Sequence, residues 1–119
     1  MFDIYRDVFL AFVRVHLLYH ATEGPIYGLE MIEELARHGY SLSPGTLYPI
    51  LHAMEVGGYL ASERQVVDGK VRKYYRATDA GRRALLQLRP KIRELVDEVM
   101  EEGGSSHPVA SEAKEGARA

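Results

Sequence analysis

The chain has 119 residues, no cysteine, 27% charged residues and a formal net charge of −2, which is typical of one globular domain with a modest core. The lack of cysteine excludes disulfides, thiol catalysis and Cys-based zinc sites. No apolar run approaches the length of a membrane span and the N-terminus has no signal-peptide layout, so we expect a cytoplasmic protein without a membrane partner.

The first helix is predicted from about residue 3 to residue 22. Two rows of apolar side chains run along it: Val8, Phe12, Val15 and Tyr19, and beside them Phe9, Val13, Leu17 and Leu18. A helix that is apolar over so much of its surface must be covered on more than one side. A small domain can cover only one side, so we expect a second copy of the chain on the other.

A second helix is predicted to open at Tyr27-Gly28, after a turn at residues 23–25, and to end at Gly39, a C-terminal cap signal. Its inward face is expected to consist of Leu29, Ile32, Leu35 and Ala36.

The third helix begins after a short link. Ser43 is expected to cap it through its hydroxyl, and Pro44 suits the first helical position, where the missing N–H costs nothing. Leu47, Ile50, Leu51 and Met54 repeat at helical spacing and predict the buried face. Gly57-Gly58 ends the helix. Two helices joined by a tight turn, the second with a polar and uncharged N-terminus, indicate a helix-turn-helix.

A β-hairpin is predicted next, with strands over residues 59–67 and 71–78 and a tight turn at Asp68-Gly69. The hairpin lies in the basic part of the chain: residues 61–83 carry seven Lys or Arg against three Asp or Glu, a net charge of +4. Such a local patch is the footprint of phosphate binding, and a basic hairpin after a helix-turn-helix is a wing. Strand alternation places Tyr74 and Tyr75 on opposite faces and leaves open which of them meets the core.

The last helix is predicted over residues 79–102, capped by Thr78-Asp79. Pro90 lies inside it and predicts a kink or a break near residues 86–90. Residues 103–119 are rich in Gly, Ser, Ala and charge and predict a disordered tail. A helix–helix seam is indicated by the three-four spacing of Leu85, Leu88, Ile92, Leu95 and Val99.

Two motif blocks resemble the PadR family of bacterial winged-helix transcriptional regulators. They are SPGTLYP at residues 43–49 and GKVRKYYR at residues 69–76, supported by Gly28, Gly58, Leu60, Thr78 and Gly81. The resemblance covers about residues 5–102 and is to the small members with a single C-terminal helix. It implies a homodimer built on the first and last helices, with the third helix and the wing on operator DNA. The chain departs from some drug-binding relatives in having no tryptophan.

The fold class expected from these elements is mostly α (α+β). Residues 1–102 form a winged helix-turn-helix domain with a two-stranded wing and dimerisation helices at about 3–22 and 79–102. The expected dimer contacts are Val8, Phe12, Leu88, Ile92, Leu95 and Val99.

The expected function is sequence-specific regulation of transcription by a homodimeric repressor on a palindromic operator, released by a small-molecule effector at the dimer interface. The third helix would read double-stranded DNA while wing cations hold phosphates. The candidate DNA-binding residues are Ser43, Pro44, Gly45, Thr46 and Tyr48 in the helix, and Lys70, Arg72, Lys73, Tyr74 and Arg76 in the wing.

Three other functions are less well supported by the sequence. We expect no enzyme and no cofactor, because the chain has no phosphate-binding Gly loop and no supported Ser, His and acid arrangement. His16 and His20 have the spacing of a metal pair, with Glu23 nearby, but such a pair is more often the polar edge of a packed helix, so no metal is expected. A metal-responsive regulator using His16 and His20, and a winged-helix protein-interaction module without DNA binding, are the alternatives.

Overall fold

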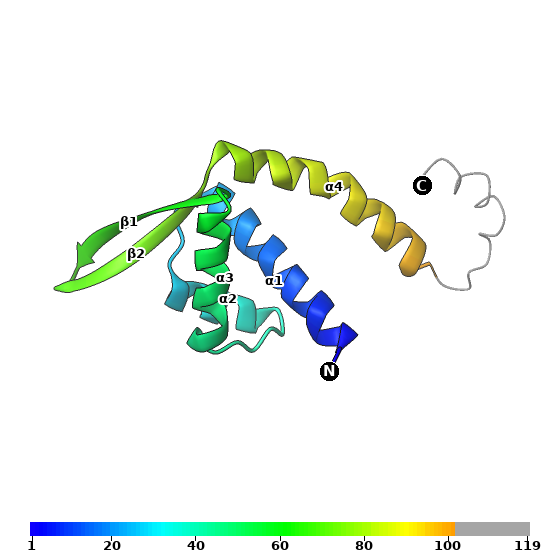
Figure 1. The fold of residues 1–119 in the computed structure, drawn as a ribbon, viewed down its shortest axis with the longest axis horizontal. Helices are drawn as coiled ribbons and strands as arrows, with labels where there is room; N and C mark the ends of the chain where they lie inside the picture. The colour runs from blue at the N-terminus through cyan, green and yellow to red at the C-terminus, as the bar shows by residue number, and fades with distance from the viewer. Residues whose placement is uncertain (102–119) are drawn as a thin grey trace. The chain divides into compact units, whose positions relative to one another are not determined.

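The computed structural model describes residues 1–101, in which four helices and one antiparallel hairpin follow the predicted order (Figure 1). The elements are α1 (Ile4–Glu23), α2 (Gly28–Arg37), α3 (Pro44–Val56), β1 (Leu60–Val67), β2 (Lys70–Ala77) and α4 (Asp79–Val99). This is a winged helix-turn-helix of the predicted mostly α class. Residues 1–86 form one compact unit, and a second begins at Gln87. None of the helices in the described residues combines the length and apolar character that a bilayer crossing requires.

One apolar core joins the helices α1, α2 and α3 to the wing, the hairpin of β1 and β2. Each element contributes the residues that its own periodicity places on one face. Burying a large aliphatic side chain contributes about 1.5–3 kcal/mol, so this cluster is the main source of stability in residues 1–86. Its buried members are Val13, Leu17, Ala21, Ile26, Met31, Leu35, Leu47, Ile50, Leu51, Leu60, Tyr75 and Ala77.

The helix α1 is apolar on two faces, as predicted. Asp3 caps it by accepting a hydrogen bond from the Arg6 amide at 3.2 Å. Val13 and Leu17 lie fully buried in the core. Val8, Phe12 and Tyr19 form the other row and stay between 42% and 46% exposed. That row leaves α1 with an apolar surface that the rest of residues 1–86 does not cover.

The predicted inward face of α2 is partly wrong. Met31 and Leu35 are buried, whereas Leu29 is 57% exposed and Ala36 is exposed. The buried row is therefore shifted by one position and starts at Gly28, where the absence of a side chain admits a neighbour. The predicted end of the helix is confirmed: Gly39 has φ +88° and its amide donates to the Ala36 carbonyl at 3.0 Å.

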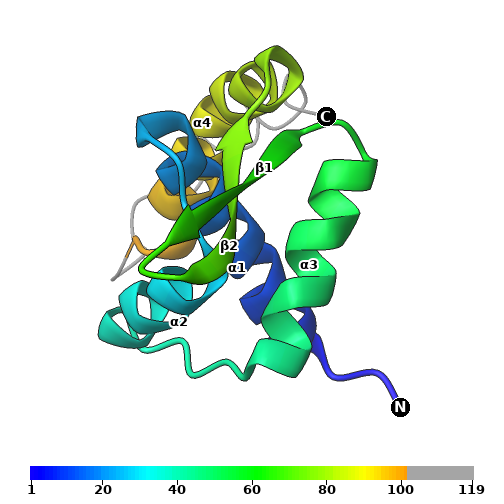
Figure 2. The same ribbon diagram turned by 90° about the vertical axis from the view of Figure 1, so that its left-hand side faces the viewer.

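The wing is confirmed, with a tight turn in which Asp68 and Gly69 have φ +51° and +78°. Its strands pair from Leu60↔Ala77 to Val67↔Lys70. A contact that the sequence did not predict joins the wing to the turn after α1: Ile26 and Tyr75 exchange two backbone hydrogen bonds, of 2.8 and 2.7 Å. The wing projects beyond α1, α2 and α3 (Figure 1), and Figure 2 shows α2 and α3 as separate helices joined by a link beside it.

The helix α4 begins as predicted, because the Thr78 hydroxyl accepts a hydrogen bond from the Gly81 amide at 3.1 Å. Of the kink or break predicted near residues 86–90, the break does not occur, because the helix is continuous from Asp79 to Val99. Pro90 removes one backbone donor, and Leu86, whose carbonyl loses that partner, is 61% exposed, so water can take its place. The tail predicted for residues 103–119 lies outside the described residues.

Candidate nucleic-acid interface

The start of α3 is built almost as predicted. Ser43 is the N-cap residue by position, with extended backbone angles of φ −88° and ψ 160°, and Pro44 is the first helical residue. The Ser43 hydroxyl does not cap the helix, contrary to prediction. It lies 3.4 Å from the Thr46 hydroxyl instead of bonding a backbone amide. The Thr46 and Leu47 amides both donate to the Ser43 carbonyl at 3.0 Å, and Pro44 has no N–H. Within the described residues, the Gly45 amide is therefore the donor of the first turn that is left for an acceptor such as a phosphate oxygen.

The two faces of α3 separate as predicted. Leu47, Ile50 and Leu51 are buried in the core. Pro44, Gly45, Tyr48 and Pro49 are exposed and Thr46 is partly exposed. The candidate DNA-reading residues of this helix therefore share one solvent-facing surface at its N-terminal end.

Tyr48 packs against the start of α2. It is 44% exposed, and its ring and hydroxyl lie directly over Gly28, where a Cβ atom would overlap them. Gly28 therefore sets the position of Tyr48 by having no side chain. The sequence showed both residues but gave no sign that they touch.

The face of the wing that carries Lys73 is tied to α3. The Lys73 ammonium lies 3.4 Å from a carboxylate oxygen of Glu55, and the Ser62 hydroxyl donates to the other oxygen at 2.5 Å. The Ser62 hydrogen bond, followed by the Lys73 charge, lowers the pKa of Glu55. Lys73 also lies over the Tyr75 ring, 5.4 Å from its centre. Among the candidate phosphate ligands, Lys73 is thus a residue that holds the wing against α3.

The opposite face of the wing carries an aromatic and cationic stack. The Arg72 guanidinium lies 4.5 Å from the centre of the Tyr27 ring, and Tyr74 meets Tyr27 edge-on at 5.3 Å. Tyr75 points the other way and is 3% exposed, so it is the tyrosine that faces the core. The question left open by strand alternation is thereby decided.

Two of the candidate wing cations are exposed without a partner. Within residues 1–101, Lys70 and Arg76 have no carboxylate at ion-pair distance. Arg64 on the neighbouring strand is exposed in the same way and extends the basic surface. These side chains are available to phosphates without first breaking an internal ion pair.

A separate polar cluster lies on α1 and α2. His16 and His20 of α1 are joined by His38, the residue that ends α2, and the His16 and His38 ring centres are 5.0 Å apart. Partial burial, followed by the nearby His38 and His20, lowers the pKa of His16, against an opposing effect of Glu34. His38 had no partner pattern in the sequence, so only the fold reveals this grouping.

Comparison with known proteins identifies relatives that share this architecture. The family described as "Transcriptional regulator PadR-like family" matches residues 17–87. The transcriptional regulator Rv3488 of Mycobacterium tuberculosis is 51% identical over 102 residues, which are 86% of this chain and 94% of that protein.

Solved structures agree with this family. A PadR family regulator from Eggerthella lenta has a TM-score of 0.71 and 34% identity, over 81% of this chain and 85% of that one. A transcriptional regulator from Clostridium thermocellum has a TM-score of 0.67 and 29% identity, over 79% and 94% of the two chains.

Proposed function

Because the chain belongs to the PadR-like family of transcriptional regulators, we propose that it is a homodimeric repressor that binds a palindromic operator in double-stranded DNA. The observation that carries the proposal is the pairing of an exposed, uncharged start of α3 with a basic wing on the same compact unit. Repression follows if the bound dimer blocks a promoter. The relatives are named as regulators of transcription, which matches this function and no catalytic one.

The two DNA-facing elements have different tasks. The start of α3 enters the major groove, where Thr46 and Tyr48 contact base edges. Its first residues, Ser43, Pro44 and Gly45, bring the backbone close to a phosphate. The exposed wing cations Lys70 and Arg76 bind phosphates, which carry no base identity. The stack of Arg72 and Tyr74 on Tyr27 and the Lys73–Glu55 ion pair keep the wing in place. In a dimer the two copies of α3 would lie about 34 Å apart, one turn of the double helix.

The dimer is supported by apolar surface on the two predicted dimerisation helices. Val8 and Phe12 of α1 are exposed in the single chain. The apolar row on α4 beyond its first turns is exposed as well, and consists of Leu88, Ile92, Leu95 and Val99. Burying such side chains contributes about 1.5–3 kcal/mol each, so covering them with a second copy of the chain would favour dimerisation.

A double variant, Leu95→Asp and Val99→Asp, tests the dimer. We expect monomers in light scattering, since two buried carboxylates would replace two apolar contacts. Val66→Asp is the matched control, because Val66 is an exposed apolar residue of the wing and is not among the predicted dimer contacts. A double variant that stays folded and dimeric would contradict this use of α4.

The operator is tested by selecting bound sequences from random double-stranded DNA with the purified chain. We expect a palindrome with two half-sites one helical turn apart. Thr46→Ala should then narrow the free-energy gap between the selected site and random DNA by about 1–3 kcal/mol per base contact. Failure to retain any DNA at low salt would refute DNA binding and favour the alternative, a winged-helix module that binds another protein.

An effector site is included in the proposal. A cleft of about 460 Å³ lies between α1 and the residues that follow α2. It is lined mainly by apolar and aromatic side chains, among them Val8 and Phe12, which are proposed dimer contacts. An apolar small molecule bound there would change both the dimer contact and the link that leads to α3. Its expected effect is release of the selected operator in a titration.

A further inference from the structure

Three imidazole groups lie close together where α1 meets the end of α2. His16 and His20 lie one turn apart on α1, and His38 is brought to them by the end of α2. One ring nitrogen from each residue can be chosen so that all three lie within 4.8 Å of one another. The rings are close to parallel, with 24° between His16 and His38 and 14° between His16 and His20.

This arrangement is close to that of a tetrahedral metal site. With Zn–N bonds of about 2.0–2.1 Å, two nitrogen ligands of a tetrahedral ion are about 3.3 Å apart. The histidine nitrogens need to approach by at most about 1.5 Å, which side-chain rotation can supply because His38 is exposed and the other two rings are partly exposed. Zinc sites with three protein ligands hold a water in the fourth position, so three histidines are enough protein ligands for such a site.

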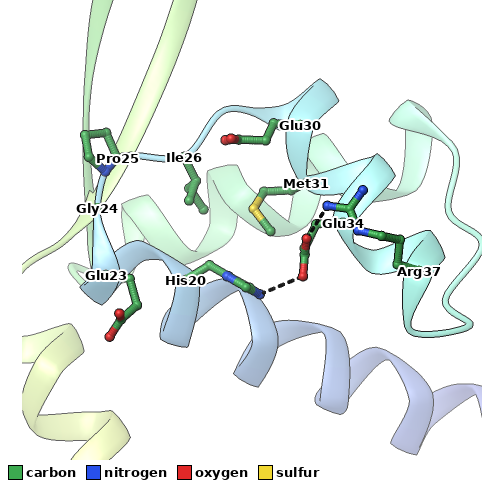
Figure 3. A pocket seen from close by; sticks show the side chains of 9 residues that line it. All are labelled: His20, Glu23, Gly24, Pro25, Ile26, Glu30, Met31, Glu34 and Arg37. Atoms are coloured by element: carbon green, nitrogen blue, oxygen red, sulfur yellow. Dashed lines mark hydrogen bonds and ion pairs between the residues drawn. The ribbon is translucent and has the colours of Figure 1, made fainter.

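A carboxylate is held beside the histidines. Glu34 of α2 has one oxygen 3.1 Å from His38 Nε2 and 3.7 Å from His20 Nε2. Its other oxygen is held by the Arg37 guanidinium. Figure 3 shows His20 pointing from α1 toward Glu34, with Arg37 on the far side. Glu34 therefore supplies negative charge and orients two of the three rings, which is the task of the carboxylate that accompanies metal-bound histidine.

The cluster is open to solvent on one side. A cleft of about 260 Å³ lies next to it and is lined by His20, Glu30, Glu34 and Arg37 among others (Figure 3). A hydrated ion can reach His20 through this opening and exchange a water for its nitrogen ligand.

We propose that His16, His20 and His38 bind one divalent transition-metal ion of the zinc class, with Glu34 as the accompanying carboxylate. Imidazole nitrogen suits zinc, copper and nickel, whereas magnesium and calcium require oxygen ligands. Bound metal joins the C-terminal half of α1 to the residue that caps α2, immediately before the link that leads to α3. The metal thus stabilises the pairing of the two helices that support α3.

Isothermal titration of the full metal-free chain with zinc tests the site. We expect one zinc per chain, no heat with magnesium, and an increase in Tm of about 10 °C or more at a hundredfold excess of zinc over its Kd. Cobalt(II) serves as a spectroscopic probe, since its visible absorption distinguishes four-coordinate from six-coordinate sites.

Variants assign the ligands. Glu34→Gln should weaken zinc binding by about 10–100-fold, and His38→Ala by at least as much. His38→Ala is the safest ligand variant, because His38 is exposed and its loss leaves the core intact. The matched control replaces His52, the one histidine of residues 1–101 outside the cluster, and should keep the parent affinity.

Two results would overturn the site: no zinc bound by the folded chain, or full affinity in the His16→Ala and His38→Ala variants. Circular dichroism without metal checks that each variant is folded. Zinc binding is measured without DNA, so its outcome is separate from that of the proposed repressor function.

Discussion

Lys70→Ala and Lys73→Ala form a matched pair that tests which wing cations bind phosphate. Lys70 is exposed at the start of β2 and has no carboxylate at ion-pair distance within residues 1–101, whereas Lys73 is held 3.4 Å from Glu55. Each phosphate contact contributes about 0.9 to the slope of log affinity against log salt. A dimer has two copies of Lys70, so Lys70→Ala should flatten the slope by about 1.8. Lys73→Ala should flatten it by less than half as much.

The assay is the affinity for the selected operator and for random DNA at several salt concentrations. Across a fourfold rise in salt, the parent should lose about tenfold more affinity than Lys70→Ala on both DNAs. Lys73→Ala should instead lower the free energy of unfolding, since it removes the ion pair between wing and α3. A slope that Lys70→Ala leaves unchanged, or that Lys73→Ala flattens equally, would refute this division of tasks.

Three further variants probe contacts that only the fold reveals. Gly28→Ala should displace the Tyr48 ring and weaken operator binding in a gel-shift titration. The free energy of unfolding from chemical denaturation should change by no more than about 1 kcal/mol, because the partly exposed ring can rotate away from the new methyl group. Gly81→Ala should lower the free energy of unfolding by about 1–3 kcal/mol in the same denaturation experiment, because its new methyl group would overlap the backbone carbonyl of Tyr59. An unchanged free energy of unfolding would contradict that packing. Ser62→Ala should raise the pKa of Glu55 toward its ordinary value in an NMR titration. Because the pKa of Glu55 is lowered in the folded state, its carboxylate contributes to the free energy of unfolding at pH values above its unfolded-state pKa. That contribution is lost as pH falls through the folded-state pKa. The Ser62→Ala variant should therefore lose less stability than the parent on acidification.

Local signals in the sequence determined the elements and their order. The caps and stops at Gly39, Gly58 and Asp68-Gly69 depend on positive φ angles that few residues adopt, so they can be recognised without tertiary information. The buried face of α3 was predictable because its spacing leaves one helical solution. The two motif blocks were enough to indicate the PadR family, which the family comparison confirmed.

Contacts between elements were decided only by the tertiary structure. The inward face of α2 was misjudged because hydrophobicity favoured Leu29, whereas packing placed Gly28 and Met31 against the neighbouring helix. The Lys73–Glu55 ion pair and the bridge from Ile26 to Tyr75 join residues far apart in the chain, and no local pattern encodes such distances. The histidine cluster is the clearest case. The spacing of His16 and His20 is visible in the sequence, but His38 reaches them only because α2 turns back along α1 and ends beside them.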